Sequence, residues 1–191
     1  AIRFGETSLV VTIFTELFGV QTYMVNGVRT SKKSSAKANY FLPGAMLDLV
    51  VYHNEQKNMQ RIREFGWAVL YRHVLSDVIK NSIALYMVEL LYKSLKQPEQ
   101  NEPLFYFCED VLLHLDKADR LVTANMPLYF ALHFSHFLGF KMNDDYDEVQ
   151  NILDLQEGNF VPEQPAHPHF IEGDCALLTS QLLKVMHPDE L

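Results

Sequence analysis

Histidine and cysteine are the side chains from which a metal site is most often built, and their spacing here is not that of a metal site. His167 and His169 lie in a proline-rich stretch, with Cys175 and His187 further along the chain. Standard zinc motifs pair their ligands with about two to four residues between them, which this set does not. We therefore interpret residues 162–169 as a proline-rich surface loop and expect no metal and no other cofactor.

The other residues that could carry catalysis occur in patterns typical of structural roles. His114, His133 and His136 lie among Leu, Phe and Tyr in helical segments, where a neutral histidine bonded to a carbonyl is commoner than a base. The acids of residues 144–148 lack the glycine and final glutamate of a calcium loop, and we interpret them as a first helical turn. Glycine-rich phosphate loops and Gly-x-Ser-x-Gly are absent. We expect no enzyme; a hydrolase using His133 or His136 is a distant alternative that a deep polar cleft beside them would support.

Basic residues are concentrated in the first part of the chain. Up to Arg72 there are nine Lys and Arg against five Asp and Glu, a net charge of +4, while the rest carries 7 against 19, or −12. Arg61 and Arg63 are two apart in a strand pattern, so they should share a face. A basic strand face beside a lysine-rich loop is the electrostatic track that single-stranded nucleic acid needs. The candidates are Arg29, Lys32, Lys33, Lys37, Arg61 and Arg63.

Four aromatic residues could complete such a nucleic-acid site. Tyr23, Tyr40, Phe41 and Tyr52 lie in or next to the same strand patterns and could stack on bases. The alternative is that they fill the interior of a barrel while the charges only solvate its outside. The spacing of the residues leaves both alternatives open.

The elements that must position these residues change type after Gly66. Alternating apolar patterns predict five strands, and a bend at Gly27 would give the curvature that a small barrel requires. Beyond Gly66 the apolar period becomes about 3.6 and predicts helices, interrupted by a β-hairpin around Glu157 and Gly158. The predicted strands are 2–4, 8–15, 20–29, 45–52 and 59–65, the hairpin is 152–161, and the helices are 70–95 (one long or two short), 104–115, 123–140 and 174–186. We predict an α+β protein of two domains, a strand-rich domain 1–66 and a helical domain 67–191.

Composition limits the compartment and the partners. With 48% hydrophobic and 21% charged residues the chain has the composition of a soluble globular protein, and no apolar run is long enough to span a bilayer. No secretory signal is visible, and the two cysteines, Cys108 and Cys175, suit a reducing compartment. We expect a cytoplasmic protein with no membrane partner and no small-molecule substrate.

The sequence resembles the bacterial recombination mediator family RecO. The resemblance is carried by the run from Arg3 to Thr15, which opens Phe-Gly-Glu-Thr-Ser, and by the run from Gly19 to Arg29. Pro43-Gly44 and the helical pattern 84–95 extend it, so that it covers nearly the whole chain. The resemblance implies an N-terminal five-stranded OB-type β-barrel and a helical domain with a short β-hairpin insertion.

Two departures accompany this resemblance. Many members bind zinc through four cysteines near residues 154–175, where only Cys175 is present, so no metal is carried over. The sequence also begins within the family's first strand and ends at Leu191 before its final helical segment, which implies a trimmed or incomplete chain.

The resemblance implies a protein without catalytic activity that acts in DNA repair. It would bind single- and double-stranded DNA, anneal complementary strands and, with RecR, help to load RecA onto DNA coated by SSB; it would be associated with the nucleoid. The SSB C-terminal tail would dock on the helical domain, where the candidate cations are Lys80, Lys93, Lys117 and Arg120. Arg3 joins the DNA-binding candidates by this resemblance. The alternative is a protein-interaction module with a structural barrel and no nucleic-acid binding.

Overall fold

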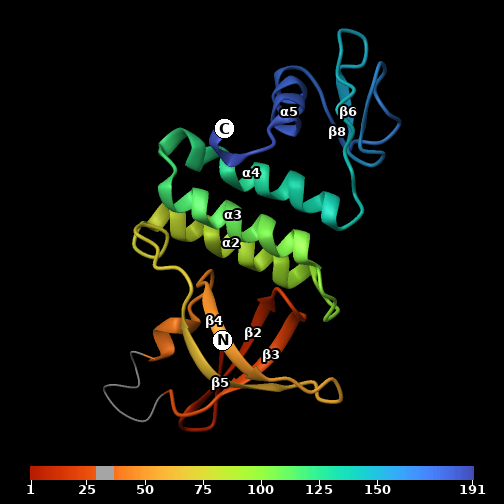
Figure 1. Ribbon diagram of the computed structural model, residues 1–191. Coiled ribbons are helices and arrows are strands. Elements are labelled where there is room, and N and C mark those ends of the chain that lie inside the picture. Colours follow the sequence, from red (N-terminus) through yellow and green to blue (C-terminus); the bar gives the residue numbers. More distant parts are fainter. Residues whose placement is uncertain (29–36) are drawn as a thin grey trace. The chain divides into compact units, whose positions relative to one another are not determined.

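The computed structural model describes residues 1–28 and 37–191 and shows two compact units, Ala1–Asp116 and Lys117–Leu191 (Figure 1). The first unit contains β1 (Ile2–Phe4), β2 (Ser8–Thr15), β3 (Gly19–Val25), the short 3₁₀ helix η1 (Asn39–Phe41), β4 (Leu47–Tyr52), β5 (Gln60–Trp67), α2 (Val78–Ser94) and α3 (Glu102–Lys117), whose last residue belongs to the second unit. The second contains α4 (Arg120–Phe137), β6 (Ile152–Asp154), β7 (Asn159–Val161), β8 (Phe170–Ile171), α5 (Asp174–Lys184) and the 3₁₀ helix η2 (Pro188–Glu190). The predicted fold class is confirmed. The domain limits 1–66 and 67–191 stay a prediction.

The five N-terminal strands form one sheet of the OB type. Their hydrogen-bonded order is β1-β2-β3-β5-β4, in which β3 and β5 run parallel and the other neighbours are antiparallel. Five strands in a partly open Greek-key arrangement are characteristic of the OB fold. Strand β3 ends at Val25, so the strand predicted to continue to residue 29 is shorter than expected.

The inner face of this sheet carries the core of the first unit. Its buried residues come from β2, β3 and the segment that follows β3: Leu9, Val11, Tyr23, Val25, Val28 and Phe41. Ile62 and Phe65 of β5 pack against them. Because alternate strand residues point to opposite faces, a buried inner row leaves the intervening side chains on an outer face.

Helix α2 begins later than the apolar period predicts. The pattern over residues 70–95 suggests a helix from Leu70, whereas α2 starts at Val78. Asp77 caps it, because its side chain accepts the N–H groups of Ile79 and Lys80. Residues 68–77 are an irregular link between the sheet and the helix.

A buried aspartate at the end of α3 holds this link in place. The Asp116 carboxylate accepts backbone N–H groups from Arg72, His73 and Val74 at 2.9, 2.8 and 2.9 Å. Burial alone would raise the pKa of Asp116, but these N–H donors outweigh it and lower the pKa below its ordinary value. The Asp116 carboxylate, which keeps residues 72–74 out of a helix, is therefore more than 40 residues away in the sequence.

The turn between β2 and β3 packs against the helical part of the first unit. The Tyr106 hydroxyl of α3 donates to Glu16 at 2.6 Å, and the rings of Phe14 and Phe105 lie 5.8 Å apart. Gly19 has a φ of +62°, and a Cβ atom there would collide with the backbone carbonyl of Glu99. A side chain at position 19 would therefore force the turn and the connection between α2 and α3 apart.

The second unit combines helix α4 with a small three-stranded sheet and α5. Asp119 caps α4 through the N–H groups of Leu121 and Val122, so the helix begins before the predicted residue 123 and Pro127 lies inside it. The small sheet has the order β7-β6-β8 and includes the predicted hairpin. In the described part of the chain, no helix is long and apolar enough to cross a membrane.

Candidate nucleic-acid interface

The outer face of the five-stranded sheet presents an arginine between a tyrosine and a methionine. Arg61 of β5 pairs with Tyr52 of β4 on one side and with Met24 of β3 on the other. Residues that pair directly across strands place their side chains on the same face. The adjacent pair, Tyr23 and Gln60, is buried, so the row containing Arg61 faces outward. Tyr52 is 63% exposed.

Arg61 is available to bind an anion. Its side chain is exposed and makes no ion pair with any residue in the two described ranges. A guanidinium group keeps its charge at any physiological pH and can bind phosphate in a bidentate way. With the Tyr52 ring beside it, the face offers a charge for the phosphate and a flat surface for the base.

A β-bulge in β5 places Arg63 and Glu64 together at the surface. Val50 pairs with Glu64 and Val51 with Ile62, which leaves Arg63 as the extra residue of β5. The Arg63 Nε atom lies 3.0 Å from the Glu64 Oε1 atom, and both side chains are more than half exposed. This carboxylate partly neutralises Arg63, so Arg61 is the stronger of the two candidates for a phosphate contact.

The turn between β4 and β5 adds a lysine that the sequence argument did not include. Gln60 is buried, and its side-chain amide donates to the carbonyls of Asn54 and Lys57 and accepts the Asn54 N–H. These three hydrogen bonds fix the turn, and Lys57 lies exposed on it. The polar composition of residues 53–58 predicts the turn, but the bracing by Gln60 has no local sequence signal.

Of the remaining predicted basic residues, Arg3 is the one that the strand register places off this face. Arg3 pairs with Leu9, a core residue, so Arg3 belongs to the opposite face from Arg61 and is exposed because β1 lies at the sheet edge. Lys37 is exposed just before η1. Arg29, Lys32 and Lys33 lie outside the described residues.

Three of the four aromatic residues that could stack on bases belong to the core. Tyr23 is fully buried, Phe41 is 9% exposed, and Tyr40 stacks on Trp67 with ring centroids 4.6 Å apart. For Tyr23, Tyr40 and Phe41 the alternative of filling the barrel interior therefore holds, because the register of β3 and the packing of η1 turn them inward. Tyr52 is exposed and stays a candidate for stacking.

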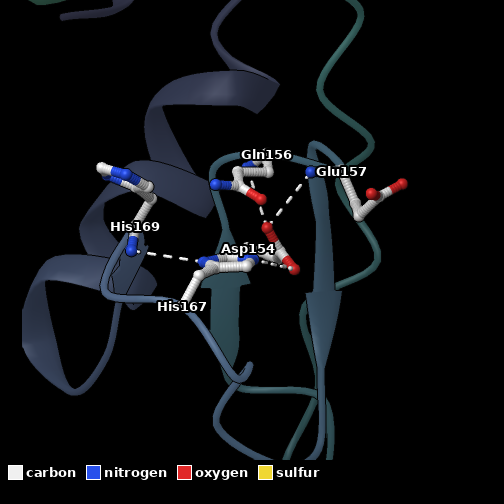
Figure 2. Close-up of polar contacts among 5 residues, drawn as sticks. All are labelled: Asp154, Gln156, Glu157, His167 and His169. Atoms are coloured by element: carbon white, nitrogen blue, oxygen red, sulfur yellow. Dashed lines mark hydrogen bonds and ion pairs between the residues drawn. The ribbon is translucent and has the colours of Figure 1, made fainter.

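One histidine of the proline-rich stretch, His167, contacts a buried aspartate. Figure 2 shows the Asp154 carboxylate at the end of β6, accepting the N–H groups of Gln156 and Glu157 at 2.8 and 3.1 Å. Its other oxygen lies 3.3 Å from the Nε2 atom of His167, whose Nδ1 atom accepts the N–H of His169. Burial raises the pKa of Asp154, while the two N–H donors and His167 lower it, and the net shift is downward.

This region does not fit the zinc centre that the family resemblance describes. Cys175 is exposed on α5, and the Asp154 and His167 side chains are already engaged with each other. Within residues 1–28 and 37–191, no three His, Cys, Asp or Glu side chains lie close enough together to hold a metal ion.

The acidic run 144–148 does not form the predicted helical turn. Asp144 accepts a hydrogen bond from the Ser180 hydroxyl at 2.6 Å, and its other oxygen lies 3.2 Å from the Lys184 ammonium. Asp145 accepts a backbone N–H of β7 at 3.0 Å. The segment is irregular because these carboxylates bind α5 and β7 rather than capping a helix.

The helix histidines lie in structural surroundings. The His114 Nδ1 atom contacts the Asp110 carbonyl one turn earlier in α3 at 2.9 Å. His133 packs on Tyr129 with ring centroids 4.3 Å apart. Burial lowers the pKa of His133, and the neighbouring His136 lowers it further, which favours a neutral imidazole.

The cations predicted to receive an acidic protein tail differ in their surroundings. The Lys80 ammonium donates to a backbone carbonyl at the end of α3, and Lys93 lies 2.7 Å from Glu89. Lys117 and Arg120 are exposed.

The chain is an α+β protein in which an N-terminal OB-type sheet is followed by helices. The outer face of that sheet carries an exposed arginine and an exposed tyrosine. Two family models match the chain: Recombination protein O N terminal over residues 1–70, and Recombination protein O C terminal over residues 75–154. The two matches together include the sheet, α2, α3, α4 and β6.

Curated relatives match over most of the same chain. DNA repair protein RecO of Flavobacterium johnsoniae is 32% identical over 165 residues, which cover 84% of this chain and 67% of the relative. The protein of that name from Phocaeicola vulgatus is 31% identical over 185 residues, covering 96% and 76%. That from Christiangramia forsetii is 32% identical over 173 residues, covering 91% and 71%. The chain belongs to the RecO family of DNA repair and recombination proteins.

Proposed function

We propose that this chain is a non-catalytic recombination mediator that binds single- and double-stranded DNA on the outer face of its five-stranded sheet. It anneals complementary strands and, with RecR, helps to load RecA onto DNA coated by SSB. The observation that carries the proposal is the outward-facing row formed by the exposed Tyr52 and Arg61 and the half-buried Met24, within a family of DNA repair proteins.

The chemistry of this face suits a flexible single strand. Phosphates need exposed cations, which Arg61, Arg63 and Lys57 supply, and splayed bases need flat apolar surfaces such as the Tyr52 ring. Arg29, Lys32, Lys33, Lys37 and Arg3 are proposed as further DNA contacts. Among these contacts Arg3 would be the weakest, because it belongs to the face of the sheet opposite Arg61.

The two predicted domains divide the work in this proposal. Residues 1–66 bind DNA, and the acidic residues 67–191 dock protein partners, namely RecR and the SSB C-terminal tail. Lys117 and Arg120 are the exposed cations of that part that we propose for the acidic tail. The protein would act in the cytoplasm, at the nucleoid.

The direct test is an anisotropy titration of a fluorescein-labelled single-stranded oligonucleotide at several salt concentrations. For three neutralised phosphates, the logarithm of the association constant should fall with the logarithm of salt with a slope of about −2. Absence of binding at low salt would contradict the proposal and support a protein-interaction module with a structural barrel.

A second assay separates DNA binding from mediator activity. Annealing of complementary oligonucleotides coated with SSB is measured in three reactions, which contain this chain alone, RecR alone, or both proteins. The proposal expects annealing by the chain. Binding without annealing would leave a DNA-binding protein and remove the mediator role.

A further inference from the structure

A groove of about 530 Å³ lies in the first unit where β3 and β5 separate. The register pairs the two strands at Tyr23 with Gln60 and Met24 with Arg61, so the first residues of β3 extend past the start of β5. The walls come from the β2–β3 turn and the start of β3, from the β4–β5 turn, and from residues 96–100. Its volume falls in the range of about 300–1,000 Å³ typical of ligand pockets.

The walls of this groove are held in place by contacts within the first unit. Phe18 of the β2–β3 turn stacks on His53 of the β4–β5 turn, with ring centroids 3.8 Å apart and planes 11° from parallel. Gln60 braces the β4–β5 turn from inside. Gly19 lies against the backbone of Glu99, which fixes the third wall. A preformed groove binds a ligand without first having to order its walls.

The chemistry of the lining matches an unpaired nucleotide. Leu17, Phe18 and Val20 give an apolar surface, while Asn58 carries an amide that can bond a base edge. Lys57 and Lys96 supply two cations for phosphate against one lining carboxylate.

The groove is continuous with the outer face of the sheet. Met24 lies in the row of Arg61, and Thr22, the next β3 residue on that face, lines the groove. A strand that lies across Tyr52 and Arg61 therefore meets the groove within the length of β3. This continuity favours a nucleotide of the same strand over an acidic peptide as the occupant.

We propose that this groove is a nucleotide subsite: it takes one unpaired base of a bound single strand, with the adjoining phosphates on Lys57 and Lys96. The subsite rests on the proposed function, because it extends the DNA path on the outer face. It also gives the protein a preference for unpaired DNA, since a base held in a duplex cannot enter.

The test uses the full chain and two probes, a labelled oligo-dT strand and a labelled duplex of equal length. Thr22→Trp fills the groove without removing a charge, and a K57A and K96A double variant removes its cations. The matched control is a K93A and K141A double variant, which removes the same charge at two lysines that do not line the groove. Unfolding midpoints in urea confirm that each variant is folded.

Both groove variants should weaken single-strand binding about tenfold, while T22W should change duplex binding less than about twofold. An oligo-dT strand made abasic throughout should bind wild type more than tenfold more weakly, because it also loses stacking on Tyr52, and it should bind wild type and T22W equally. If wild type binds the oligo-dT strand and T22W binds it equally well, the subsite is wrong and the proposed function stands. Equal losses on both probes by T22W would also overturn it. If wild type binds neither probe, the subsite and the proposed function both fail.

Discussion

The outer face of the five-stranded sheet and the small sheet β7-β6-β8 both gather residues that could do chemistry, but they use them differently. On the outer face, Arg61 is exposed and makes no ion pair with the described part of the chain, and Tyr52 beside it is exposed. In the small sheet, Asp154 is 5% exposed, and its two oxygens are engaged by backbone N–H groups and by His167.

The difference shows why residue type alone does not define a site. A buried charged group whose hydrogen bonds are made by its own chain gains little further stabilisation from a ligand. An exposed arginine without an ion-pair partner can still gain such stabilisation by binding a phosphate. The Asp154 carboxylate is therefore satisfied within the second unit, whereas Arg61 is exposed and is the residue that we propose for a phosphate contact.

Charge reversal at Arg61 and at Arg3 tests this comparison most strongly. The two variants change the net charge equally, but Arg61 lies on the proposed DNA face and Arg3 on the other. Arg61→Glu should weaken single-strand binding at least about tenfold and flatten the salt dependence, while Arg3→Glu should weaken it less than about threefold. Anisotropy titrations measure both.

Equal losses for R61E and R3E would mean that net charge, and not a defined face, drives binding. Because Arg61 is exposed, its substitution should leave the free energy of unfolding within about 0.5 kcal/mol of wild type. If the free energy of unfolding changed by more than this, the loss of affinity could not be attributed to a lost phosphate contact.

Tyr52 tests the aromatic part of the same face. Tyr52→Leu removes a ring 63% exposed on the outer face and should weaken single-strand binding by about 1–2 kcal/mol. Tyr52→Phe keeps the ring and should bind like wild type, which separates stacking from hydrogen bonding by the hydroxyl. If Tyr52→Leu binds as tightly as wild type, Tyr52 does not stack on a base.

The alternation of apolar residues is enough to predict the sheet, because burial on one face imposes a period of two on each strand. It fails at the bulge of β5, where Ile62 and Phe65 both face the core although they are three apart. Two consecutive polar residues, Arg63 and Glu64, are the signal of that bulge in the sequence. The start of α2 could not be predicted locally, because Asp116 binds a link more than 40 residues earlier.

The site was predictable only in part, since burial depends on which strands pair. Tyr23 and Tyr52 have the same side chain in similar strand patterns, but the register turns one inward and the other outward. The outward orientation of Arg61 can be predicted from the alternating strand pattern alone. Lys57 and the groove beside it depend on contacts between separate turns, which no local pattern contains.

Asp154→Asn tests the other side of the comparison. The pKa of Asp154 is lowered from its ordinary value of 3.8, so the folded state favours the ionised form. Its contribution to stability is fully present above pH 3.8 and is lost as the pH falls through the lower folded value. D154N should therefore unfold at lower urea concentration than wild type at pH 7, and the difference should shrink at about pH 3.

Glu163→Gln is the matched control, because it removes an exposed carboxylate from the same proline-rich stretch. It should leave the unfolding midpoint unchanged at both pH values, and neither variant should alter single-strand affinity. A D154N chain as stable as wild type at pH 7 would mean that the His167 contact does not stabilise the small sheet. A D154N chain of wild-type stability but weaker DNA binding would make Asp154 part of the interface. The contrast between the small sheet, whose charges are bonded within the chain, and the outer face of the five-stranded sheet, whose Arg61 is exposed, would then fail.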